Sequence, residues 1–62
     1  MKNQQLHDEE TEFARGCDKQ AEHDDAILRA GNDEIYLDHV EMRRNWCRQL
    51  AENARERADY WS

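Results

Sequence analysis

The sequence contains no proline, and its 62 residues include only two glycines, Gly16 and Gly31. Proteins built from several β-strands need frequent turns, which these two residue types usually supply, so their scarcity argues against a β fold. No apolar run reaches the length of about 18 residues that a transmembrane helix requires. Residues 1–8 hold no apolar stretch of the kind found in a secretory signal. We therefore expect an all-α, cytoplasmic protein that does not enter a membrane.

The charged residues are unequal in number and unevenly distributed. There are 15 acids and 9 bases, which gives a net charge of −6. Residues 1–42 hold 12 of the acids and 4 of the bases, whereas residues 43–62 hold 3 acids and 5 bases. This polarity suits two segments that lie against each other, and it argues against a broad basic face for nucleic acid. Such a high content of charged residues favours disorder. We therefore expect a chain that is partly folded alone and better folded when it is paired with another chain.

The strongest boundary in the sequence is the segment from Ala30 to Glu34. Gly31 suits the left-handed residue that often ends a helix, and Asn32 or Asp33 can cap the next one. Glu34 then places a negative charge on the first turn, where the helix dipole favours it. The segment therefore predicts a tight turn between two antiparallel helices.

Helical periodicity extends on both sides of this turn. We predict a frayed segment at residues 1–4, a helix over about 5–30, a turn at 31–33 and a helix over about 34–60, with residues 5–62 as one domain. Gly16 costs its helix about 1 kcal/mol relative to alanine. Asp18 could cap a new helix after it, so a kink or break near Gly16–Asp18 is the alternative.

The two halves differ in their large apolar side chains. Residues 2–31 contain four (Leu6, Phe13, Ile27 and Leu28), and residues 32–62 contain nine (Ile35, Tyr36, Leu37, Val40, Met42, Trp46, Leu50, Tyr60 and Trp61). The thin stripe of the first helix cannot cover the wide face of the second. The excess must meet a second copy or another protein. We predict a homodimer in which two hairpins form a four-helix bundle.

In a hairpin that turns about residue 32, residues whose numbers sum to about 64 lie side by side. Phe13 then faces Ala51, and Cys17 faces Cys47. Two cysteines are too few for a disulfide scaffold. Free thiols packed as small core residues are the favoured interpretation, a disulfide is the first alternative, and a redox or metal role is the second.

Motifs of catalysis and of metal binding are missing. Thr11 and Ser62 are the only hydroxyl residues besides the tyrosines, and the sequence has no nucleophile elbow, phosphate loop or zinc-binding spacing. His23 and His39 could approach each other beside the turn, but a solvated polar patch is favoured over a metal site. We predict that the protein is not an enzyme and that it binds no cofactor and no metal.

Function is therefore expected to lie in binding another macromolecule. The leading hypothesis is a small protein-binding adaptor or inhibitor, of the type that phages and plasmids direct against host proteins. Tryptophan and arginine are enriched among residues that dominate protein interfaces. The predicted partner-binding residues are Met42, Arg43, Arg44, Trp46, Leu50, Tyr60 and Trp61.

Two alternatives involve nucleic acid. The first is an acidic mimic that occupies a basic groove through Asp8, Glu9, Glu10, Glu12, Asp24 and Asp25, although an acidic face often serves solubility alone. The second is a dimeric hairpin that binds RNA or DNA through Arg43, Arg44, Arg48, Arg55 and Arg57. The same arginines could instead pair with the acidic first helix within the chain.

Overall fold

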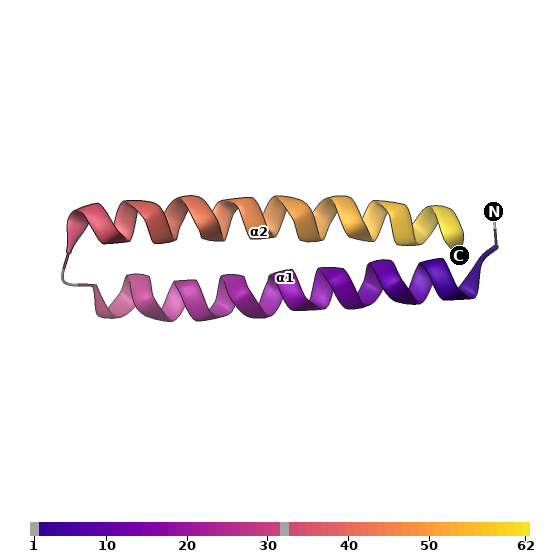
Figure 1. Ribbon diagram of the computed structural model, residues 1–62, viewed down its shortest axis with the longest axis horizontal. Coiled ribbons are helices and arrows are strands. Elements are labelled where there is room, and N and C mark those ends of the chain that lie inside the picture. The colour runs from indigo at the N-terminus through magenta and orange to yellow at the C-terminus, as the bar shows by residue number, and fades with distance from the viewer. Residues whose placement is uncertain (1, 32) are drawn as a thin grey trace.

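The protein is an antiparallel hairpin of two long helices, α1 (Gln4–Ala30) and α2 (Glu34–Trp61). The computed structural model describes residues 2–31 and 33–62, and its Cα atoms span 47 × 13 × 11 Å. The helices lie side by side along their whole length, so that the start of α1 lies beside the end of α2 (Figure 1). The predicted all-α hairpin is confirmed. Neither helix has an apolar stretch long enough to cross a membrane, as far as the described residues show.

Side chains cap the beginning of each helix. The Asn3 side chain accepts a hydrogen bond from the Leu6 amide at 3.1 Å, and Asp33 accepts two, from the amides of Ile35 and Tyr36, at 3.0 and 3.2 Å. These bonds satisfy amides that have no partner within the first helical turn. The predicted cap at Asp33 is confirmed, while the alternative cap at Asn32 falls outside the described residues.

The helix predicted through Gly16 is confirmed, whereas Gly31 differs from the sequence-based expectation. Helix α1 runs without interruption through Gly16, which has open space beside it, and Asp18 pairs with Arg55 on α2 instead of capping a new helix. Gly31 has φ −46° and ψ 136°, so it is not left-handed. A Cβ at Gly31 would press on the side chain of Leu37, which would have to shift to admit it.

The predicted register of the hairpin is confirmed at its open end. The amide of Asn3 donates to the carbonyl of Trp61 at 2.8 Å, and the residue numbers sum to 64. One turn further along, Nδ1 of His7 donates to the carbonyl of Ala58 at 2.9 Å. Since a carbonyl oxygen can only accept, the imidazole must carry its proton on Nδ1 in this contact.

Small side chains form the seam between the helices. Its centre is a cluster of Ala14, Ala51 and Ala54 with Cys17 packed against it, and Ala21, Val40 and Ala58 are also buried. The expectation that Phe13 faces Ala51 across this seam is wrong, because Ala14 takes that place and Phe13 is 47% exposed. Alanines let two helices approach closely, and that approach leaves no room for larger groups.

Candidate functional site

Several large apolar side chains of α2 are exposed, away from the alanine seam. Four of them fall within about 20° of one line along the helix at 3.6 residues per turn. They are Ile35, Met42, Trp46 and Tyr60, which are 76%, 70%, 65% and 59% exposed. We call these four residues the outer strip. The strip lies far around the helix from the alanine seam, so α2 carries a second apolar face, which is exposed at Ile35, Met42 and Trp46.

An open groove of about 520 Å³ lies at the middle of the outer strip. It is lined by His39, Met42, Arg43, Asn45, Trp46 and Gln49. Its apolar surface comes from the thioether of Met42 and the indole of Trp46, which stand one helical turn apart. Polar side chains border them, so the groove resembles the core and rim of a protein interface on a small scale.

The far end of the outer strip is aromatic. The rings of Tyr60 and Trp61 meet edge to face, with centroids 4.8 Å apart and planes at 79°. Trp61 is partly buried, whereas Tyr60 is exposed. Edge-to-face contacts of this kind are favourable, and the two rings form one aromatic surface at the end of the strip.

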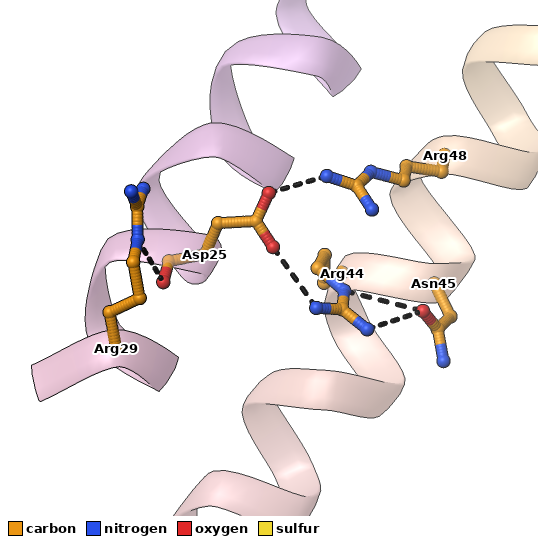
Figure 2. Close-up of polar contacts among 5 residues, drawn as sticks. All are labelled: Asp25, Arg29, Arg44, Asn45 and Arg48. Carbon is orange, nitrogen blue, oxygen red and sulfur yellow. Dashed lines mark hydrogen bonds and ion pairs between the residues drawn. The ribbon is translucent and has the colours of Figure 1, made fainter. Parts of the chain in front are cut away.

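Every arginine of α2 is paired with a carboxylate of α1. Arg43 binds Asp24, both Arg44 and Arg48 bind Asp25, Arg55 binds Asp18, and Arg57 binds Glu10. Figure 2 shows Asp25 between two of these arginines, with one carboxylate oxygen toward each guanidinium. The predicted basic cluster therefore serves as a set of cross-links between the helices.

Asp24 is the one charged side chain among the described residues that is fully buried. Its carboxylate accepts hydrogen bonds from Arg43 at 2.9 and 2.6 Å and from Gln20 at 3.0 Å. The bond from Arg43 holds the pKa of this carboxyl below its ordinary value, against the opposite effect of burial. Asp24 therefore remains charged and fixes Arg43 at the border of the groove.

The structure brings together some of the predicted partner-binding residues and separates others. Met42, Arg43 and Trp46 line one groove, with Leu50 partly buried beside them and the Tyr60–Trp61 pair at the end of the strip. Arg44 is absent from this surface, because it projects from the opposite side of α2, where its guanidinium binds Asp25. Three polar residues complete the lining of the groove, namely His39, Asn45 and Gln49. The spacing of apolar residues, on which the predicted site was based, does not identify them.

The predicted acidic face also divides. Glu10, Asp24 and Asp25 bind arginines of α2, while Glu12 binds Arg15 within α1. Asp8 and Glu9 remain exposed and accept hydrogen bonds only from neighbouring glutamines. Half of this face is thus committed to the hairpin itself.

The histidines and cysteines show no ligand geometry for a metal. Across residues 2–31 and 33–62, no group of three or more His, Cys, Asp or Glu side chains could hold a metal ion. Cys17 and Cys47 are free thiols that line one hollow beside Phe13. Burial raises the pKa of the Cys47 thiol, and the neighbouring Cys17 adds to this effect.

No family model, curated protein or solved structure matches this chain. A function for it must therefore be inferred from the geometry of the hairpin itself.

Proposed function

We propose that this protein is a non-catalytic binding module that holds a helix of a partner protein against the outer strip of α2. The observation that carries the proposal is the exposure of Met42 and Trp46 beside a core made of alanines. Side chains of this size cost free energy when water surrounds them, and single soluble domains seldom line them up on one face. A partner helix with apolar residues three and four positions apart fits such a strip.

The module would act as an adaptor or as an inhibitor of the phage or plasmid type. An inhibitor needs only to cover the partner helix, and a hairpin 47 Å long offers enough length for several turns of contact. We also propose a cytoplasmic location, because Cys17 and Cys47 are free thiols and thiols persist in a reducing compartment.

The test uses a synthetic amphipathic peptide with a leucine ridge and uncharged glutamine flanks. We expect the protein to bind it with measurable heat in calorimetry, and we expect Trp46→Ala and Met42→Ala each to weaken binding at least about tenfold, as hot-spot truncations do. Phe13→Ala is the matched control, since Phe13 is also a half-exposed large side chain but lies on α1. Equal losses in all three variants, or no binding by the unmodified protein, would overturn the proposal.

The outer strip could instead be covered by a second copy of the chain, and one observation favours this alternative. The hairpin exposes 4801 Å², whereas a compact monomer of its mass exposes about 4,250 Å². Two hairpins joined in a four-helix bundle would remove part of this excess. Light scattering over a hundredfold range of concentration decides between the occupants. A dimer that Trp46→Ala converts to monomer would make the second copy the occupant.

The two nucleic-acid hypotheses have weaker support. An RNA or DNA binder needs arginines that are free to meet phosphates, but those of α2 have carboxylate partners on α1. An acidic mimic would have to rely on the acids that remain exposed, such as Asp8 and Glu9. A gel shift with RNA or DNA that Arg43→Ala weakens would restore the first of these hypotheses.

A further inference from the structure

A row of acidic side chains runs along one edge of the outer strip. Six acids of α2 project between about 60° and 120° from the strip, all on the same flank, at 3.6 residues per turn. They are Glu34, Asp38, Glu41, Glu52, Glu56 and Asp59, and all six are exposed. We call them the acidic edge. Three of these acids lie toward the turn and three toward the end of α2, and Asn45 stands between the two groups, beside Trp46.

The acidic edge differs in its pairing from the acids of α1 that bind arginines. None of its six carboxylates forms an ion pair with any residue in 2–31 or 33–62. The arginines of α2 do not serve this purpose, since their guanidinium groups bind carboxylates of α1. The arginines of α2 therefore neutralise acids of α1, and the acids of α2 beside the strip keep their negative charge.

The other flank of the strip has a different character. His39, Leu50 and Arg57 lie there, and Arg57 is already bound to Glu10 at 3.0 Å. A helix that docks on the strip thus meets a row of carboxylates along one side and a neutralised surface along the other. The arrangement distinguishes partner helices by the charge of one edge, as charged flanking positions do in coiled coils.

We infer that the partner helix is basic, with an apolar ridge that meets the outer strip and a row of lysines or arginines on the one side that meets the acidic edge. This inference rests on the proposed function and adds the chemistry of the partner to it. Charge complementarity supports it, because like charges across an interface repel and opposite charges steer association.

The experiment compares three peptides that share one leucine ridge and differ only along one flank, which carries lysine, glutamine or glutamate. At low salt we expect the lysine peptide to bind about tenfold more tightly than the glutamine peptide, because several exposed ion pairs each add a small factor. We expect the glutamate peptide to bind more weakly than both. At about 0.5 M salt the three affinities should converge, since the charges are exposed to screening.

Variants of the protein locate the effect on the acidic edge. Glu52→Gln with Glu56→Gln should reduce the preference for the lysine peptide several-fold. Glu9→Gln with Glu22→Gln is the matched control, because it removes the same charge from exposed sites of α1. An equal reduction by both pairs would assign the preference to net charge and overturn the inference.

The two proposals fail in different ways. If the lysine and glutamate peptides bind equally while Trp46→Ala still abolishes binding, the basic partner is wrong and the helix-binding function stands. If no peptide binds, or if a second copy covers Trp46, both proposals are wrong.

Discussion

The buried carboxylate of Asp24 on α1 and the guanidinium of Arg43 on α2 form a two-point contact across the hairpin, with hydrogen bonds of 2.9 and 2.6 Å. An alanine seam is nearly uniform along its length and by itself tolerates a shift of one helix past the other. A fixed pair of this kind specifies one register. Because Arg43 also borders the groove beside Trp46, the contact links the register of the fold to the shape of the proposed binding surface.

Replacing Asp24 by asparagine should lower the stability of the hairpin at pH 7 and flatten its response to acid. The pKa of Asp24 is lowered in the folded state, mainly by the hydrogen bond from Arg43. Its contribution is therefore fully present above the ordinary carboxyl pKa of about 3.9 and is lost as the pH falls through the lower folded-state value. Urea unfolding followed by circular dichroism should show the wild type well ahead of Asp24→Asn at pH 7, with the gap shrinking toward pH ~3. A gap of the same size at both pH values would contradict this account.

Replacing Gly16 by alanine should stabilise the protein by about 0.5–1 kcal/mol, because glycine is a poor residue for a helix interior. A methyl group there meets no other atom, so nothing offsets the gain. Gly31→Ala is the informative contrast, since its new methyl group would press on Leu37 and force that side chain to move. If Gly16→Ala instead destabilised the chain in urea, α1 would have to bend at this point in solution.

Replacing Ala51 by leucine should destabilise the hairpin by about 1–3 kcal/mol, the usual cost of forcing extra methylenes into a packed seam. Ala51 is completely buried in one cluster with Ala54 of its own helix and Ala14 of α1, so the helices would have to separate. Ala26→Leu provides the control on the exposed side of α1 and should change the free energy of unfolding by less than about 0.5 kcal/mol. Equal effects at the two sites would mean that alanines do not form the seam.

These positions show how far the sequence leads. The turn, the cap at Asp33 and the register can be predicted from local signals, namely a single glycine, a capping side chain and the constraint that antiparallel neighbours have a constant sum. Which residues of α1 are buried cannot be predicted in this way. Phe13 and Ala14 are adjacent in sequence, and the apolar pattern favours the larger side chain. Close packing of alanines reverses that choice, and it does so only once both helices are in place.

The proposed site, too, could be predicted from the sequence only in part. Trp46 and Met42 stand out as large apolar residues that a thin first helix cannot cover. The acidic edge was hidden among 15 acids, since only the pairing of arginines with α1 reveals which carboxylates remain without a cation. Arg44 was included in the predicted surface, but at 3.6 residues per turn it projects from the side of α2 opposite the strip. There it binds Asp25 (Figure 2).

The thiol of Cys47 should react slowly near neutral pH and recover its reactivity at alkaline pH. Burial raises the pKa of this thiol, which lowers the fraction of reactive thiolate. Cys17→Ala leaves Cys47 as the only thiol, and its reaction with an aromatic disulfide can be followed with and without urea. The folded chain should react more slowly at pH ~7.5, with the difference narrowing above the ordinary thiol pKa of about 8.5. A ratio of rates that does not change with pH would mean that steric cover alone protects the thiol.

The emission of Trp46 should report directly whether the outer strip is free. This indole is 65% exposed on a single hairpin, so a variant in which Trp61→Phe leaves only Trp46 should emit at long wavelength and be quenched efficiently by acrylamide. The reciprocal variant, Trp46→Phe, reports the partly buried Trp61 and should emit at shorter wavelength. If raising the protein concentration moves the emission of Trp46 to the blue while that of Trp61 stays constant, a second copy occupies the strip. If both spectra are independent of concentration, the strip stays exposed to solvent, as the binding of a foreign helix requires.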